Sequence, residues 1–314
     1  MLRFERYIFL ICTCSAALVL AAQPWRNLKP KTFCGDDRHR TLVKKHGRFP
    51  VKTLIRSDDN GSMAHLAKDS IMQLNGGAFE EEVAKLLKSP AVIFYTVFAI
   101  TSVLVLNMPV GSLGNRILFL VIGYNVALVT VATKNRYQDW LDLYKFLAPL
   151  SLLQVLPDFF QADYQQVLVY PDTGGPFIGP VSAAMALGIW TIPLFALTLL
   201  GRYVEQRKGR KKDGFVAVAL AGLVVFGIAE GHAWRIPIWE TMNCKQLGKM
   251  SYFSLAADMV LGLLVYAFTP AVASCSFLLR LVVATLMMLA FTGTASITYL
   301  FTDIIPRNLQ CNAT

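Results

Sequence analysis

Residues 251–269 read SYFSLAADMVLGLLVYAFT, a run in which Asp258 is the single charged side chain. At a rise of about 1.5 Å per residue, a helix of this length extends about 28 Å. The hydrocarbon core of a bilayer is about 30 Å thick, so such a helix is long enough to cross it. We therefore interpret this run as a transmembrane helix.

Six further apolar runs repeat this pattern between residue 90 and the end of the chain. They lie at residues 91–107, 115–133, 140–157, 178–201, 214–232 and 277–302. The whole chain is 55% hydrophobic and 16% charged, whereas a soluble domain carries about 25% charged residues. The period-two alternation of a membrane β-barrel is absent. The sequence predicts an all-α, polytopic transmembrane helical bundle of about seven spans over residues 90–314.

The formal net charge of +10 is concentrated near the N-terminus. Residues 1–60 hold twelve Lys or Arg and five Asp or Glu, a balance of +7, which leaves +3 for the rest of the chain. Nucleic-acid-binding domains cluster their basic residues on one folded surface, and no basic stretch interleaved with aromatic residues occurs here. We expect membrane lipids as partners, and no nucleic acid.

The N-terminal 60 residues have the layout of a targeting segment. Residues 1–22 place Arg3 and Arg6 before an apolar core that ends in small residues, as in a signal sequence. Residues 23–60 are basic and lack periodicity, as in a transit peptide. This layout resembles the two-part presequences of algae with secondary plastids. An uncleaved signal anchor is the alternative. Residues 61–89 are expected to form two short amphipathic helices.

The basic loops indicate the orientation of the spans. On one side, here called side A, fall residue 90 and the loops around 134–136 and 202–213, which are rich in Lys and Arg. Side B receives residues 158–177, 233–250 and the C-terminal tail. Short basic loops stay on the cytosolic side, which corresponds to the stroma in a plastid. We expect a plastid membrane, with the secretory pathway or plasma membrane as the alternative.

Carboxylates from four spans fall near side B. They are Asp158, Glu230, Asp258 and Asp303. Asp258 lies about two turns inside its span, where a charge is costly unless it is paired, hydrated or protonated. We predict catalytic roles for Asp258, Glu230 and Asp158, with Asp258 as the leading acid. A carboxyl group that only bonds a neighbouring helix is the alternative.

Other polar and aromatic residues near side B are candidates for binding. They are His232, Trp234, Tyr252, Tyr299 and Asp303. His232 and Trp234 are also typical of the headgroup level of a bilayer, so an interfacial role is the alternative for them. Trp190, between Gly188 and Pro193, is interpreted as helix packing around a kink.

Cysteine usage gives one further hypothesis. Cys244 and Cys311 both fall on side B, and an oxidising compartment there would allow a disulfide between them. Two free thiols are the alternative.

Three functions remain open on this sequence. The absence of phosphate-binding, nucleophile-elbow and metal-site motifs predicts no cofactor and no metal. Acid/base chemistry on a lipophilic substrate of the isoprenoid, carotenoid or quinone-like class needs none. A carrier coupled to protons or ions and a scaffold subunit with a membrane-complex partner are the alternatives. The enzyme requires a closed apolar cavity with Asp258 in its wall, the carrier a polar path towards side A, and the scaffold a paired Asp258.

Overall fold

The computed structural model describes residues 88–232 and 236–306. All the described residues belong to one compact unit. The expected targeting segment and residues 61–87 of the expected amphipathic pair lie outside the described residues. They stay predictions.

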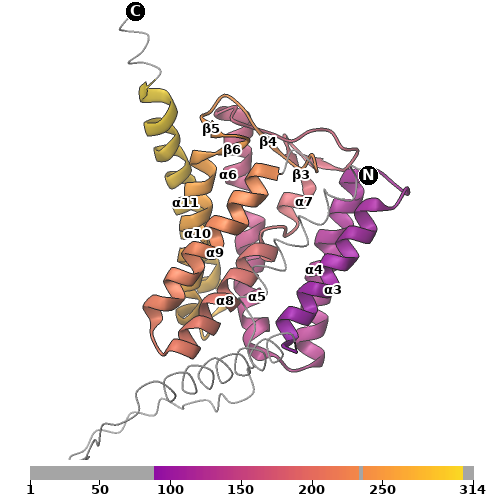
Figure 1. Ribbon diagram of the computed structural model, residues 1–314, viewed down its shortest axis with the longest axis vertical. Coiled ribbons are helices and arrows are strands. Elements are labelled where there is room, and N and C mark those ends of the chain that lie inside the picture. Colours follow the sequence, from indigo (N-terminus) through magenta and orange to yellow (C-terminus); the bar gives the residue numbers. More distant parts are fainter. Residues whose placement is uncertain (1–87, 233–235, 307–314) are drawn as a thin grey trace, which may run out of the picture. The chain divides into compact units, whose positions relative to one another are not determined.

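The described chain is a bundle of long helices that run up and down in sequence order (Figure 1). The elements are α3 (Pro90–Asn107), α4 (Leu113–Lys134), α5 (Gln138–Leu153), α6 (Val155–Phe159), the π-helix η1 (Phe160–Tyr164), α7 (Ala183–Ala186), α8 (Thr191–Lys208), α9 (Lys211–His232), α10 (Tyr252–Val272), α11 (Phe277–Tyr299) and the π-helix η3 (Leu300–Ile304). Side-chain hydroxyl caps at Ser89, Ser112 and Ser276 begin α3, α4 and α11.

Six of these helical segments are long and apolar enough to cross a membrane. They are Pro90–Asn107, Leu113–Lys134, Ala183–Lys208, Lys211–His232, Tyr252–Val272 and Phe277–Ile304. The protein is therefore a multi-pass membrane protein with an α-helical transmembrane region. A seventh helix, α5 with α6 and η1, packs against α4, α8 and α11 inside the bundle. Because α5 itself has 16 residues, the count of seven spans stays a prediction.

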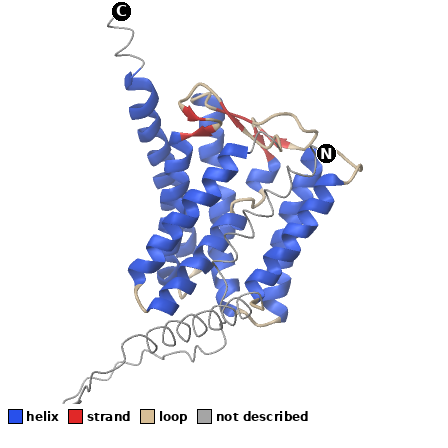
Figure 2. Ribbon diagram, viewed as in Figure 1, coloured by secondary structure: helices blue, strands red, loops and turns tan. Residues whose placement is uncertain are grey.

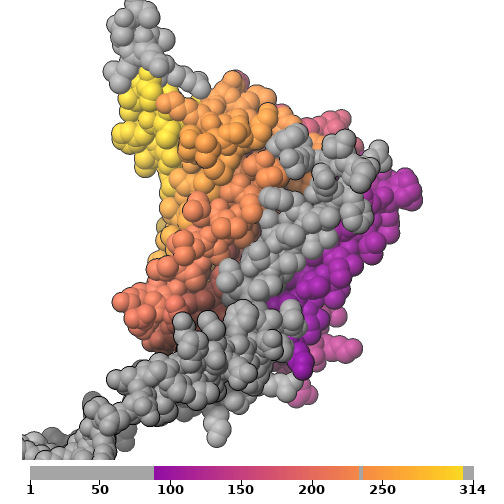
Figure 3. All heavy atoms as spheres, in the orientation of Figure 1, coloured from indigo at the N-terminus to yellow at the C-terminus, as the bar shows by residue number. Residues whose placement is uncertain are grey.

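Lipid contact explains the apolar residues on the outside of the bundle. On α3 the exposed large side chains recur every three or four residues, at Ile93, Val97, Ile100 and Leu104. On α11 they recur in the same way, at Leu278, Val282, Leu286 and Leu289. The atoms of α3 (indigo) and of the end of α11 (yellow) form two flanks of the face shown in Figure 3. Exposing such continuous apolar stripes to water would cost free energy, whereas contact with hydrocarbon is favourable.

The span expected at residues 178–201 differs in the structure at both ends. It starts as the short α7 and breaks at Gly188, whose φ of 114° is unfavourable for other residues. It then continues as α8 to Lys208 and ends at Gly209, in the left-handed conformation of a helix C-cap. Several basic residues that were expected in a loop thus lie in the last turns of a helix. There the negative end of the helix dipole stabilises their positive charges.

Short strands gather at the end of the bundle that corresponds to side B (Figure 2). The antiparallel pairs are β1 (Leu168–Val169) with β4 (Glu240–Thr241), β2 (Phe177–Ile178) with β3 (Val181–Ser182), and β5 (Gln246–Leu247) with β6 (Met250–Ser251). The β1–β4 pair aligns Leu168 with Thr241 and joins two loops that are distant in the sequence.

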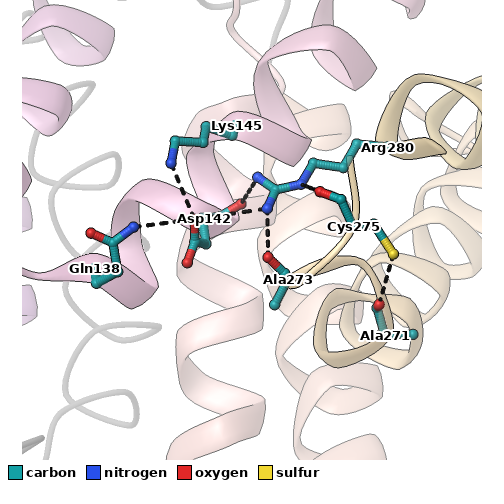
Figure 4. Close-up of polar contacts among 7 residues, drawn as sticks. All are labelled: Gln138, Asp142, Lys145, Ala271, Ala273, Cys275 and Arg280. Carbon is teal, nitrogen blue, oxygen red and sulfur yellow. Dashed lines mark hydrogen bonds and ion pairs between the residues drawn. The ribbon is translucent and has the colours of Figure 1, made fainter. Parts of the chain in front are cut away.

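At the opposite end of the bundle, a buried arginine makes polar contacts with several segments. Figure 4 shows these contacts. The guanidinium of Arg280 on α11 donates hydrogen bonds to the carbonyl oxygens of Ala273 and Cys275 and lies 3.8 Å from the Asp142 carboxylate of α5. The exposed Lys145 pairs with the same carboxylate at 3.2 Å. Arg280 therefore connects Asp142 of α5 to the turn between α10 and α11.

Candidate functional site

Three carboxyl groups from three helices line one cavity of about 250 Å³. Asp158 lies in α6, Glu230 near the end of α9, and Asp258 in the second turn of α10. Their exposed fractions are 3%, 7% and 2%. The structure thus brings together the three residues predicted to be catalytic.

The rest of the cavity wall is apolar and aromatic. The rings of Phe98, Trp190, Phe226 and Phe291 contribute to it from four different helices or their ends. Trp190 packs against Phe226 and Phe291, with ring centroids 6.2 Å and 5.7 Å away. No Lys, Arg or His side chain of the described residues lines this cavity. The wall therefore suits a lipophilic molecule, and its ionisable groups are all acidic.

Five polar side chains in this wall hold a buried atom that has no hydrogen-bond partner among the described residues. The atoms are Asp158 Oδ2, Gln161 Nε2, Tyr170 Oη, Trp190 Nε1 and Asp258 Oδ1. A buried polar atom without a partner costs about 1–3 kcal/mol. Such atoms are rare in native proteins, and each calls for an explanation, for example by water or a ligand. Five of them around one cavity give its wall a polar part beside the apolar one.

Tyr170 and Trp190 lie beside Asp158, close enough for a weak hydrogen-bond interaction with its carboxyl group, but neither meets the distance and angle of a well-formed hydrogen bond. Burial raises the pKa of the Tyr170 hydroxyl well above its ordinary value, and the neighbouring charge of Asp158 raises it further. The phenol therefore keeps its proton and can act as a hydrogen-bond donor.

Glu230 differs from the two aspartates because its oxygens are satisfied. Oε1 accepts a hydrogen bond from Trp239 Nε1 at 3.1 Å, and Oε2 accepts one from Ser251 Oγ at 3.2 Å. Glu230 and Trp239 also border a second pocket of about 20 Å³, whose remaining lining comes from Glu240, Thr241 and Lys249. Glu230 therefore lies between the apolar cavity and a small polar pocket on side B.

The structure places the predicted binding residues outside the cavity wall, apart from Trp234, which lies outside the described residues. His232 Nδ1 is 3.1 Å from the carbonyl oxygen of Ile228 in its own helix. Tyr252 is exposed at the start of α10. Tyr299 Oη donates to the carbonyl oxygen of Asn243 at 3.3 Å. Asp303 accepts hydrogen bonds from the backbone N–H of Lys245 and from Thr302 Oγ1. Tyr299 and Asp303 thus hold the loop between α9 and α10.

Four polar residues of the cavity wall are not among the predicted site residues, namely Gln161, Tyr170, Trp190 and Trp239. Trp190 was assigned to packing alone, although its indole N–H is buried and unpaired. A signal was present in Gly188-x-Trp190-x-x-Pro193, which marks a break in the span. A helix break inside a membrane is tolerated where it is buried in protein or lines a cavity.

Cys244 is half-buried in the loop between α9 and α10. Burial and the nearby charge of Asp303 raise the pKa of its thiol to about 11. Cys311 lies outside the described residues, so the disulfide between them stays a prediction.

Comparison with known proteins finds one similarity. A family model described as a domain of unknown function, DUF6989, matches residues 155–302. No curated protein and no solved structure matches the chain. The matched region includes all three carboxyl groups of the cavity, whereas α3 and α4 lie outside it. From α6 to η3 the chain is therefore similar to a family whose function is unknown.

Proposed function

We propose that this membrane protein is an enzyme that acts on a lipophilic substrate, of the isoprenoid, carotenoid or quinone-like class, by carboxyl acid/base chemistry. The observation that carries the proposal is Asp258 Oδ1, which is buried in the wall of an apolar cavity and has no partner among the described residues. A carboxyl group in this position can give its proton to a bound molecule.

The reaction that best fits this wall is proton addition to a carbon–carbon double bond. The O–H bond of the Asp258 carboxyl breaks, the π electrons form a new C–H bond, and the positive charge remains on the adjacent carbon. A neighbouring carboxylate, Asp158 or Glu230, then removes a proton from the next carbon. The product is an isomer of the substrate. The faces of Trp190, Phe226 and Phe291 stabilise the cation while it exists.

Glu230 is suited to returning protons to the cavity. The adjacent polar pocket of about 20 Å³ has room for about one water molecule. Its lining of Glu240, Thr241 and Lys249 offers the polar partners that such a water needs. We assign Glu230 the transfer of protons between side B and Asp258.

The two alternative functions fit these observations less well. A scaffold requires Asp258 to be paired with a neighbouring helix, and Oδ1 is unpaired among the described residues. A carrier requires polar groups that continue from the cavity towards side A. Asn125, a buried polar residue in the middle of α4, already bonds Val121, Gly188 and Thr191.

A comparison of lipid profiles tests the proposal. The wild-type chain, Asp258→Asn and Asp163→Asn are produced at equal levels in the membranes of the same host, and the extracted prenyl lipids and pigments are compared. Asp163 is a matched control because it is an exposed aspartate in η1, close in sequence to Asp158. We expect wild type and Asp163→Asn to shift the profile and Asp258→Asn to leave it at the level of the empty host. A full shift with Asp258→Asn contradicts the proposal.

The proposed location is a plastid membrane, with side B away from the stroma. It depends on the layout of residues 1–60 and on the basic loops of side A. Imaging of a C-terminally tagged copy, with protease protection before and after membrane opening, tests both parts. A tag found on the stromal side of its membrane contradicts the orientation.

A further inference from the structure

Three of the other side chains with an unpaired atom, Gln161, Tyr170 and Trp190, gather around Asp158. Gln161 follows Asp158 by three residues, where the helix continues into η1, so the two share a face. Tyr170 follows β1, and Trp190 precedes α8. Both lie beside Asp158, as their electrostatic interaction with it shows. Asp158, Gln161 and Tyr170 are 3%, 4% and 7% exposed, so bulk water does not satisfy their polar atoms.

The donors and acceptors of this group define what can bind to it. Gln161 Nε2 and Trp190 Nε1 can only donate, Asp158 Oδ2 accepts when ionised, and the Tyr170 hydroxyl can do either. A ligand oxygen must therefore accept from an N–H group and also donate to the carboxylate. An alcohol does both with one atom. A ketone or an ether can only accept, and a hydrocarbon leaves every one of these atoms unpaired.

We propose that the cavity binds a lipophilic alcohol whose hydroxyl lies among Asp158, Gln161, Tyr170 and Trp190. The inference rests on the proposed function in one respect, since it takes the same cavity as the substrate site. It adds the head group of the substrate and assigns these residues to recognition of that group. Asp258, on α10, remains available for the acid step.

The size of the cavity limits how much of the alcohol it encloses. At about 30 Å³ for each water-sized group, a volume of about 250 Å³ holds roughly eight such groups. The hydroxyl group and the first isoprenoid unit of a prenol fit in this space beside Phe226 and Ile189. A longer chain has to extend beyond it.

Binding measurements on the purified full chain in detergent test this inference. The probes are a fifteen-carbon prenol, its methyl ether and the hydrocarbon with the same skeleton. Binding is followed by intrinsic tryptophan fluorescence, because Trp190 and Trp239 line the cavity, and independently by thermal stabilisation. We expect the prenol to bind at least about tenfold more tightly than the hydrocarbon, with the ether in between.

Two variants test which side chains cause the preference for the prenol over the hydrocarbon. Tyr170→Phe and Gln161→Leu each remove a polar atom with little change in volume, and we expect each to reduce the preference for the prenol several-fold. Tyr164→Phe is the control, since Tyr164 is an exposed tyrosine of η1. Equal affinities for prenol and hydrocarbon overturn the inference. So does a full preference in the Tyr170→Phe, Gln161→Leu double variant, and either result leaves water as the partner of these atoms.

The outcomes separate this inference from the proposed function. Asp258→Asn is expected to keep the preference for the prenol while losing the shift in lipid profile. If the preference is absent and the profile still depends on Asp258, only the head-group inference fails. If the preference is present and the profile is independent of Asp258, the enzyme proposal fails and the alcohol site remains.

Discussion

Glu230 Oε1 accepts a hydrogen bond from the indole N–H of Trp239 at a distance of 3.1 Å. The second oxygen of Glu230 accepts from Ser251, the residue before α10. One carboxyl group therefore joins the end of α9, the segment before β4 and the start of α10. This geometry gives Glu230 a structural role that can be measured separately from any role in proton transfer.

The first prediction compares two substitutions of Glu230. Glu230→Ala leaves Trp239 Nε1 and Ser251 Oγ without this acceptor, and we expect it to lower the free energy of unfolding by about 2–3 kcal/mol. Glu230→Gln keeps an acceptor for Trp239 and should cost less, about 1 kcal/mol. Denaturant unfolding of the purified protein in detergent measures both. Glu240→Ala, at an exposed site, is the control, and equal losses for Ala and Gln at position 230 contradict the prediction.

The second prediction concerns the break between α7 and α8. Gly188 has a φ of 114°, and a Cβ added there would lie 2.7 Å from Asn125 Nδ2. We expect Gly188→Ala to destabilise the protein by about 2 kcal/mol or more. Gly123→Ala is a suitable comparison, because Gly123 is inside α4 and a Cβ added there would meet nothing within 4 Å among the described residues. That variant should be neutral or more stable by up to about 1 kcal/mol, and thermal unfolding of the two side by side decides the point.

The third prediction compares two cations that share Asp142. Arg280 is buried and donates to three backbone carbonyl groups, as well as pairing with this carboxylate. Arg280→Met should therefore reduce stability by about 3 kcal/mol. The Lys145 side chain is 53% exposed, so Lys145→Met should change stability by less than about 1 kcal/mol. Unfolding curves at low and high salt measure both, and a similar loss for the two variants is the result that we do not expect.

The fourth prediction uses the pH dependence of Cys244. The thiolate is the reactive form of cysteine, and the pKa of this thiol is raised to about 11. The thiol is therefore protonated at neutral pH, and its alkylation should rise with pH up to about 11. Asp303→Asn removes a charge that raises this pKa, so alkylation at pH 8 should become faster. Mass spectrometry of the labelled peptide follows the rate.

Labelling with and without reductant distinguishes slow alkylation caused by the raised pKa of Cys244 from protection by the predicted disulfide. Labelling of Cys244 that requires reductant supports a bond to Cys311. Labelling at an equal rate with and without reductant contradicts that bond and leaves the pH dependence to be tested as described.

The spans were predictable because a long apolar run has few stable structures in or out of a bilayer. Asp258 was identifiable for the same reason, since a carboxyl group is conspicuous in such a run. The extension of α8 to Lys208 was not predicted, because its charged residues resemble a loop when they are read for hydropathy alone. Gln161 and Tyr170 were missed because their position depends on how η1 and the segment after β1 come to line the same cavity as α9 and α10. No local pattern encodes that arrangement.

The boundary of the family similarity divides the cavity wall into two parts. The unpaired polar atoms and all three carboxyl groups lie within residues 155–302. The wall outside that range comes from α3 and α4, through Phe98, Ser102, Leu106, Ile117, Leu120 and Val121, and Ser102 already donates to the carbonyl oxygen of Phe98. Substitutions in these two helices can reshape the cavity without touching an ionisable group. The shape of the cavity and its ionisable groups are thus set by different parts of the chain.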